Sequence, residues 1–386
     1  MNPEQGLPPL SLYVHLPWCI RKCPYCDFNS HTLRDELPAD DYIQRLWEDL
    51  EQDLPLVWGR TVHTIYFGGG TPSLFSAAHF DRLLAGFRAR LDLAPGAEIT
   101  LEANPGTIEH DSFQAYREAG INRVSLGVQS FHDPQLQALG RIHGGDDVQR
   151  ALASLQSAGL DNFNIDLMFG LPAQSTEQAC DDVRMALAAD PAHISYYHLT
   201  LEPNTAFAVN PPPLPGEERC WEMQDAGSAL LAAAGFAQYE LSAWARPERQ
   251  SRHNLNYWRY GDYLGIGAGA HGKLSLPANG EIQRLIKVRH PRRYLAGERL
   301  AKTHVLPPAE RIFEYFLNVL RLREGFDLEH AQRRTGLDAE AFSAPLERAL
   351  NQGLLEQGGH GYRPSDLGWR FNNNFQAIFL PENDTE

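Results

Sequence analysis

The feature that most constrains the fold of this chain is a regular alternation of short apolar runs with longer amphipathic segments over the first 240 residues. The runs that we predict as strands are Leu12–His15, Val62–Phe67, Ile99–Glu102, Arg123–Val128, Phe163–Leu167 and Ile194–Leu199. The segments that we predict as helices are Ala39–Asp53, Ser76–Leu91, Glu109–Ala119, Asp146–Ala158, Thr176–Ala189 and Glu217–Ala234. Successive βα units of about 35 residues favour a parallel sheet with right-handed crossovers. The sequence therefore predicts an α/β fold built on a partial (βα)6 barrel of the TIM type.

The remainder of the chain changes character twice. A glycine- and aromatic-rich stretch at 254–272 precedes a basic run at 284–293. From about Leu306 the pattern becomes helical, and a predicted hairpin at Leu354–Tyr362 follows the helices, as in a winged helix. We therefore expect three parts: a barrel domain at 1–240, a connecting segment at 241–305, and a C-terminal helical, winged-helix-like domain at 306–386.

Charge and hydrophobicity argue against several classes of partner. The 386 residues include 34 basic and 49 acidic side chains, which gives a formal net charge of -15. Nucleic acids and anionic lipids bind positive surfaces, so neither is an expected partner. No apolar stretch approaches the roughly 18 residues that a membrane helix needs, and the N-terminus lacks the pattern of a signal peptide. We expect a cytoplasmic protein without an integral membrane segment.

Three of the five cysteines fall within eight residues, as Cys19, Cys23 and Cys26. A tight cluster with an odd total does not resemble a disulfide framework and favours thiolate ligands for a metal. The CxxxCxxC spacing follows the first predicted strand, so we place it on the loop at the C-terminal end of that strand. Three thiolates can bind three irons of a four-iron cluster and leave the fourth iron open. Cys180 and Cys220 stand alone and are predicted to be small buried hydrophobes.

A zinc site is the alternative interpretation of this cluster, with His15 or His31 as the fourth ligand. Structural zinc sites usually combine two pairs of ligands, and the sequence has no second cysteine pair. The iron–sulfur interpretation is therefore favoured.

Polar residues and glycines follow several predicted strands, at the edge where βα barrels carry functional groups. They are Gly68, Gly69, Gly70, Thr71, Glu102, Gln129, Asp166 and His198. We expect the triglycine to let the backbone approach an amino-acid moiety and to offer it free N–H and C=O groups. Glu102, Gln129 and Asp166 are predicted to form a polar ring for ribose hydroxyls and a cationic sulfonium, although the carboxylates could instead cap helices. A plain salt bridge between Arg141 and Asp166 is a further alternative.

Five segments together carry a family resemblance. They are YVHLPWC at 13–19, CPYCDF at 23–28, YFGGGTP at 66–72, LGVQSF at 126–131 and NIDLMFGLP at 164–172. This set resembles the oxygen-independent coproporphyrinogen III dehydrogenases and their sister group, the HemW-type haem chaperones. The CxxxCxxC segment after the first predicted strand also resembles the radical S-adenosylmethionine (radical SAM) superfamily, so the predicted barrel would be a radical SAM barrel.

The resemblance implies specific ligands and contacts. Cys19, Cys23 and Cys26 would bind a [4Fe-4S] cluster, whose open iron would be chelated by S-adenosylmethionine (SAM). Tyr25 would offer its backbone to the adenine. The remaining SAM contacts implied by the resemblance are Tyr13, Gly69, Gly70, Thr71, Glu102, Gln129, Arg141 and Asp166.

The two sister groups differ beside the cluster. The dehydrogenases carry a fourth cysteine two residues after the third, and here that position is Phe28. They also carry a longer segment before the first strand, which is predicted here to begin at about residue 11. Both differences argue against the dehydrogenase reaction. The chaperone group instead has a signature that His253–Trp258 (HNLNYW) matches.

Haem would need an iron ligand and partners for its propionates. An imidazole can bind haem iron, so His253 is the first candidate ligand, although such a histidine is more often packed or hydrogen-bonded. His271 is a second candidate of lower rank. The basic run is either a site for propionates or, as such runs more often are, a solvated surface. Its members are Arg284, Lys287, Arg289, Arg292 and Arg293.

The resemblance and the residues that carry it favour a haem chaperone, which binds haem and transfers it to an acceptor protein on a scaffold that holds a [4Fe-4S] cluster and SAM. The implied partners are haem, the acceptor protein and, on haem binding, a second copy of the chain. The alternative is an enzyme that converts coproporphyrinogen III to protoporphyrinogen IX by radical oxidative decarboxylation. Cleavage of SAM is compatible with either function, but dehydrogenase activity is not expected.

Overall fold

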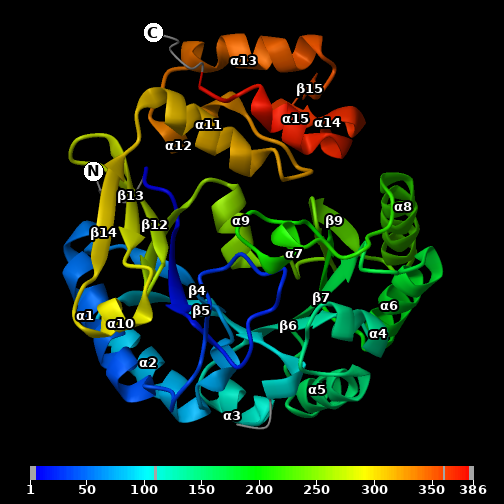
Figure 1. The fold of residues 1–386 in the computed structure, drawn as a ribbon. Coiled ribbons are helices and arrows are strands. Elements are labelled where there is room, and N and C mark those ends of the chain that lie inside the picture. Colours follow the sequence, from blue (N-terminus) through cyan, green and yellow to red (C-terminus); the bar gives the residue numbers. More distant parts are fainter. Residues whose placement is uncertain (1–5, 108–110, 360, 382–386) are drawn as a thin grey trace.

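Six parallel strands form the centre of the sheet, as predicted. The computed structural model describes residues 6–107, 111–359 and 361–381. Within these residues the six strands lie side by side in chain order, and the curved sheet stays open instead of closing into a barrel (Figure 1). The strands are β1 (Leu10–Leu16), β4 (Thr61–Gly69), β5 (Asp92–Ala103), β6 (Arg123–Gln129), β7 (Phe163–Phe169) and β8 (His193–His198).

The crossover helices cover the outer face of this sheet (Figure 1). One predicted helix, Glu109–Ala119, differs at its start: residues 109 and 110 lie outside the described residues, and the described helix begins only at Phe113. The reason is a cap, because the Ser112 hydroxyl accepts a hydrogen bond from Ala115 N. The crossover helices are α1 (Ala39–Val57), α2 (Ala77–Arg88), α3 (Phe113–Glu118), α5 (Gly145–Ser157), α6 (Thr176–Ala188) and α8 (Glu217–Ala233).

Alternation along the strands decides which side chains enter the interior. On β6, Val124, Leu126 and Val128 belong to the hydrophobic core, whereas Ser125 and Gln129 face an interior cavity. β7 and β8 repeat this pattern. A TIM barrel normally fills its interior with layers of apolar side chains. Here one face of each strand is polar, so the interior is left as a ligand-sized space.

The sheet continues beyond the parallel strands at both edges. β11 pairs in parallel with β1, and three further strands extend that edge in antiparallel fashion. The predicted connecting segment at 241–305 therefore supplies strands of the same sheet. The added strands are β9 (Ala237–Glu240), β10 (Ala243–Ala245), β11 (Asp262–Ile266), β12 (His271–Leu276), β13 (Glu281–Lys287) and β14 (Leu300–Val305).

The remaining helices of the first 305 residues are short. They are α4 (Asp133–Ala138), α7 (Ala206–Val209), α9 (Arg252–Trp258) and α10 (Pro291–Leu295). Helix α9 carries the HNLNYW segment and contacts β1, β4 and β11. None of the helices in the described ranges is both long and apolar enough to cross a membrane.

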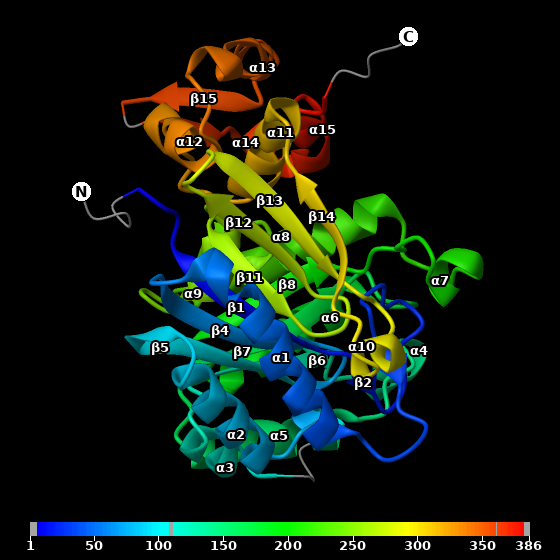
Figure 2. The same cartoon turned by 90° about the vertical axis from the view of Figure 1, so that its left-hand side faces the viewer.

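The C-terminal domain is helical and carries the predicted hairpin. It has its own hydrophobic core around Tyr315 and Phe316, and it lies beside the ends of β12 to β14 (Figures 1 and 2). Two short helices follow the hairpin. The elements are α11 (Pro308–Val319), α12 (Leu328–Thr335), α13 (Glu340–Asn351), β15 (Leu355–Gly358), β16 (Gly361–Pro364), α14 (Asp366–Arg370) and α15 (Asn372–Ala377).

Candidate functional site

The three clustered cysteines lie on one loop that follows β1 and is closed at its base. Two short strands, β2 (Trp18–Cys19) and β3 (His31–Thr32), pair in parallel there. Leu33 N also donates to Cys19 O at 2.8 Å. Inside the loop, Cys26 N donates to Cys23 O at 3.2 Å. The closed base keeps all three thiols close to the interior of the sheet, at the C-terminal end of β1 where the sequence predicts them.

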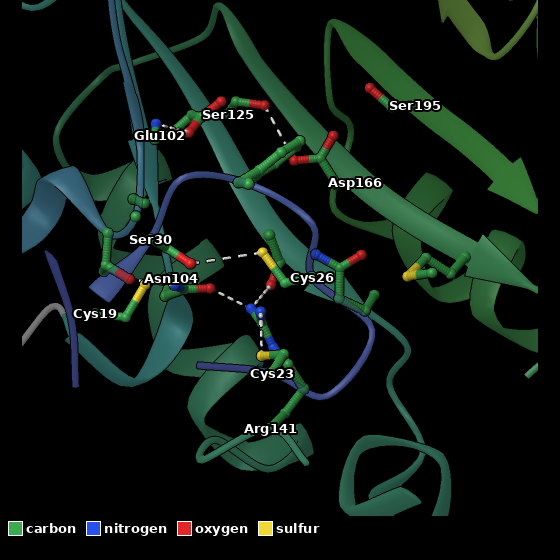
Figure 3. Close-up of a pocket in the computed structure, with 18 of the residues that line it drawn as sticks. Cys19, Cys23, Cys26, Ser30, Glu102, Asn104, Ser125, Arg141, Asp166 and Ser195 are labelled. Atoms are coloured by element: carbon green, nitrogen blue, oxygen red, sulfur yellow. Dashed lines mark hydrogen bonds between the residues drawn. The ribbon is translucent and has the colours of Figure 1, made fainter. Parts of the chain in front are cut away.

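The loop borders a cavity of about 470 Å³, which we call the cysteine cavity. The three cysteines lie toward one end of it, and Glu102, Ser125 and Asp166 lie toward the other (Figure 3). Most of the residues singled out from the sequence meet here. Those that line the cavity are Cys19, Cys23, Tyr25, Cys26, Phe28, Gly69, Gly70, Thr71, Glu102, Gln129, Arg141, Asp166 and His198.

The triglycine packs against the cysteine loop. A Cβ atom at Gly69, whose φ is +120°, would come within 2.6 Å of the His15 ring, and one at Gly70 would overlap the backbone of Trp18. The expectation of free N–H groups at this turn is wrong for the amides of residues 69–71, because each of them already donates a hydrogen bond within the protein. They donate to Glu102 Oε2 at 3.1 Å, Leu16 O at 2.8 Å and Trp18 O at 2.7 Å, respectively.

Arg141 brings a positive charge to the cysteine end of the cavity. Its Nη1 lies 3.7 Å from Cys23 Sγ, and its Nη2 donates to Gly127 O at 2.6 Å and to Asn104 Oδ1. A guanidinium in this position stabilises negative charge on sulfur. The alternative of a salt bridge to Asp166 is wrong for the described residues, because the partners of Arg141 are those three groups.

A buried polar network supports Asp166 and was missed by sequence reasoning. Asp166 accepts hydrogen bonds from Asn164 Nδ2 at 2.8 Å and from Ser125 Oγ at 3.1 Å. Asn164 Oδ1 in turn accepts from Ser195 Oγ at 3.1 Å. Tyr197, from β8, donates to Gln129 Oε1 at 2.8 Å. Strand period could have revealed this set, since positions two residues apart on β6, β7 and β8 face the same side.

Two of the carboxyl groups that line the cavity, those of Glu102 and Asp166, are poorly solvated. Burial raises the pKa of Glu102 to about 7, although hydrogen bonds from Tyr66 Oη at 2.8 Å and Gly69 N at 3.1 Å favour its charged form. Burial likewise raises the pKa of Asp166. A desolvated carboxylate is stabilised by a nearby positive charge. This end of the cavity is therefore suited to a cationic ligand.

Tyr13 and His253, also singled out from the sequence, do not line the cysteine cavity. Tyr13 donates to or accepts from His15 Nδ1 at 2.9 Å, and its side chain borders a second cavity. His253 is fully buried on α9, with Nδ1 2.7 Å from Thr64 Oγ1 and Nε2 2.8 Å from Tyr257 Oη. Burial lowers the pKa of His253 to about 3, so the ring is neutral at pH 7. Both of its ring nitrogens are thus already in hydrogen bonds.

The second cavity, of about 690 Å³, adjoins the first, and we call it the aromatic cavity. Phe28, Gly69 and Glu102 line both. Helix α9 lies between the two, since Asn254 lines the cysteine cavity and Tyr257 lines the aromatic cavity. The other characteristic residues of the aromatic cavity are Tyr13, Asn29, Trp258, Tyr263, His271, Lys273, Arg284 and Arg289.

The basic run does not act as one surface. Lys287 is fully buried, with Nζ 2.6 Å from Asp49 Oδ1 and 2.5 Å from Asp53 Oδ2. Arg284 is half-buried and pairs with Glu314 at 2.7 Å. The solvated-surface interpretation is therefore wrong for Lys287, which joins β13 to α1. The exposed members of the run are Arg289, Arg292 and Arg293.

The zinc alternative lacks a suitable fourth ligand. His15 is buried, and its ring nitrogens are bonded to Tyr13 Oη and to Asn29 O, each at 2.9 Å. His31 Nε2 lies 3.3 Å from Asn29 Oδ1. In the described ranges, no three His, Cys, Asp or Glu side chains converge on a position for one ion. A cubane cluster does not require such convergence, because each thiolate binds a different iron.

Comparisons with known proteins agree with this architecture. The Radical SAM superfamily pattern matches residues 13–186, and the pattern of the HemN C-terminal domain matches residues 306–371. The heme chaperone HemW of Escherichia coli K12 is 49% identical over 376 residues, covering 97% of this chain and 99% of that protein. The heme chaperone HemW of Haemophilus influenzae is 47% identical over 380 residues, with 97% and 99% covered.

A solved structure extends the comparison to the fold. The coproporphyrinogen III oxidase HemN from Escherichia coli, described as a radical SAM enzyme, superposes with a TM-score of 0.81 at 24% identity, covering 97% of this chain and 90% of that one. The structural similarity between the two proteins extends over both the open sheet and the C-terminal helices. With relatives this similar over nearly its whole length, the chain belongs to the HemW family and has the open radical SAM fold of the HemN type.

Proposed function

We propose that this protein is a haem chaperone, which binds haem and transfers it to an acceptor protein. The observation that carries the proposal is the match to relatives named heme chaperone over 97% of the chain, so that the match includes both cavities. The proposed site of action is the cytoplasm, because three clustered thiols need a reducing compartment.

The cysteine cavity fits a [4Fe-4S] cluster held by Cys19, Cys23 and Cys26. All three thiols belong to one loop and border one cavity, and Arg141 stands beside Cys23. Burial raises the pKa of the Cys19 and Cys26 thiols, so loading with iron would release protons from them. When bound, the cluster would supply one-electron chemistry and an iron without a protein ligand.

The opposite end of the same cavity fits SAM. Glu102 and Asp166 would stabilise the positive charge of the ligand, and Gln129 would accept or donate hydrogen bonds at the ribose. Thr71 and Tyr25 border the same cavity and would complete the contacts, Tyr25 through its backbone. The polar network behind Asp166 would keep its carboxylate oriented toward the ligand.

Phe28 supports the chaperone over the dehydrogenase. It occupies the position at which the dehydrogenases carry a fourth cysteine, so the thiol that they have there is replaced by an aromatic ring. Its side chain is 59% exposed and lines both cavities. An exposed aromatic ring at this boundary supports contact with a flat apolar ligand.

The test is anaerobic reconstitution of the full chain with iron and sulfide, followed by haem titration with and without SAM. The proposal expects visible iron–sulfur absorption, about four irons per chain, and stoichiometric haem binding. Transfer is then measured by mixing the haem-loaded protein with the apo form of a respiratory haem enzyme and following recovery of its activity. A mixture with apomyoglobin measures simple haem release and serves as the control.

A parallel assay distinguishes the enzyme. The same reconstituted protein is incubated anaerobically with coproporphyrinogen III, SAM and a reductant, and the porphyrins are separated. The proposal expects no protoporphyrinogen IX. Formation of that product at several turnovers per cluster, without haem binding, would replace the chaperone with the dehydrogenase.

A further inference from the structure

The aromatic cavity has the size and walls of a site for a flat ligand. Its volume of about 690 Å³ lies within the usual range for sites that bind cofactors. Tyr257 and Tyr263 meet edge to face at a ring-centroid distance of 4.5 Å, and Trp258 is backed by the Arg321 guanidinium at 4.4 Å. These contacts hold the rings in fixed orientations beside the cavity. Phe28 adds a further exposed ring at the border with the cysteine cavity.

His271 is an accessible imidazole in this cavity. It is the first residue of β12, it is exposed, and the part of the chain that the structure describes offers its ring nitrogens no hydrogen-bond partner. Desolvation and the nearby charges of Arg284 and Arg289 lower the pKa of His271, which favours the neutral ring that binds iron. His253 differs in each respect, because it is fully buried and both of its nitrogens are hydrogen-bonded.

Arg289 supplies a free positive charge at the same cavity. Its side chain is exposed and, among the described residues, no carboxylate pairs with it. Arg284 is different, since Glu314 neutralises it at 2.7 Å and Tyr263 accepts from its Nη1. A ligand with carboxylates needs such a charge on a chain whose net charge is -15. Arg289 is also held in place through its backbone, where Asn29 Nδ2 donates to its carbonyl oxygen at 2.9 Å.

We propose that haem binds in the aromatic cavity, with His271 as the iron ligand and Arg289 as the partner of a propionate. The inference rests on the proposed function, because it assumes that this protein carries haem. His253 is then a positioning residue, which holds Tyr257 at the wall of the cavity. One exposed ligand in an open cavity also suits a cargo that must leave again.

The experiment is titration of the full-length protein with haem, followed by absorption and resonance Raman spectroscopy. His271→Ala should remove the iron–histidine vibration and weaken haem binding about tenfold or more. His253→Gln, which can still hydrogen-bond to Thr64 and Tyr257, should keep the vibration. His63→Ala changes an exposed strand histidine outside the cavity and is the matched control.

Two modified porphyrins separate ligation from general damage. Metal-free protoporphyrin IX has no iron, so His271→Ala and the wild type should bind it equally well. Haem dimethyl ester lacks free propionates, so it should bind the wild type more weakly than haem does, and Arg289→Ala should not weaken it further. A tenfold drop for metal-free protoporphyrin in His271→Ala would show that the change disturbs the cavity and would overturn the ligand assignment.

The possible failures are distinguishable. If wild-type protein binds no haem, the proposed function itself is lost. If it binds haem with a histidine signature that His271→Ala retains and His253→Gln loses while its circular dichroism is unchanged, the haem chaperone stands and the inference is wrong.

Discussion

The two cavities lie side by side but are assembled in different ways. Apart from Glu202, Ser242 and Asn254, the residues that line the cysteine cavity belong to the first 200 residues, on the loop after β1 or in the neighbourhood of β4 to β8. The aromatic cavity joins β1 to α9, β11 to β13 and α11, which are more than 200 residues apart in the chain. The first cavity follows from a repeating strand pattern, and the second from long-range packing.

This difference shows that the position of a functional residue is set by local strand pattern in one cavity and by the docking of distant elements in the other. In the cysteine cavity, successive strands repeat one register, so each strand end supplies one functional group. In the aromatic cavity, the function of a residue depends on how α9 and β12 dock. His253 and His271 illustrate this, since one became buried and the other reached the cavity wall.

The largest expected effect separates the two cavities. Cys26→Ala removes one of the three proposed cluster ligands, so reconstituted protein should lose essentially all iron–sulfur absorption. Haem binding should change by less than about threefold, because no cysteine lines the aromatic cavity among the described residues. Cys220→Ala, which removes a lone cysteine on α8, is the control and should keep the cluster. Loss of haem binding in Cys26→Ala would mean that the cavities form one site.

The next effect concerns the buried ion pairs that connect β13 to α1. Lys287→Met leaves Asp49 and Asp53 without their buried cation, and removal of one partner from such a group costs about 3–5 kcal/mol. We expect Lys287→Met to unfold at a lower denaturant concentration than the wild type, as measured by far-ultraviolet circular dichroism. Arg293→Ala, at an exposed pair with Glu298, should leave the denaturant midpoint nearly unchanged, because solvent screens such a pair. Equal midpoints for the two variants would contradict the structural role of Lys287.

The third prediction concerns how the affinity of the cysteine cavity for SAM depends on pH through Glu102. Because burial raises its pKa to about 7, the carboxylate is mostly protonated at pH 6 and mostly ionised at pH 8. Affinity for cationic SAM should therefore rise about tenfold between these values, as measured by calorimetry on cluster-loaded protein. Folding stability should change with pH in the opposite direction to SAM affinity. Since the folded pKa exceeds the unfolded one, the favourable contribution present at low pH is lost as pH rises through about 7.

Two variants test that assignment. Glu102→Gln should bind SAM about tenfold more weakly at pH 8, because a charged hydrogen-bonding group is lost, and should show a much flatter pH profile. Glu202→Gln, a change at another carboxylate that lines the cysteine cavity, should keep the wild-type profile. An unchanged profile in Glu102→Gln would assign the titration to another group.

The smallest effect is expected at the border. Phe28→Ala removes an exposed ring that lines both cavities, so haem affinity should fall about fivefold through lost apolar contact. The cluster should assemble normally, because Phe28 is not a ligand. Trp58→Ala, at a side chain that is 80% exposed, is the matched control. No loss of haem affinity in Phe28→Ala would remove this residue from the haem site.

Much of the first cavity could be predicted from the sequence because its determinants are local. The βα rhythm set the order of β1, β4, β5, β6, β7 and β8, and the CxxxCxxC spacing placed Cys19, Cys23 and Cys26 on one loop. The support of Asp166 by Asn164 and Ser125 was not predicted, although all three obey the same strand period. Sequence patterns identify the face of a strand more readily than the partner of each polar group.

The sequence by itself determined the parallel βα core and the cysteine loop, because strand period, helix period and residue spacing act over short distances. Only the tertiary structure decided that Lys287 is buried between two aspartates, that His253 is sealed by Thr64 and Tyr257, and that His271 faces an open cavity. The physical reason is that burial and hydrogen bonding depend on contacts between residues far apart in the chain. Identical side chains, two histidines here, acquire different chemistry only when those contacts form.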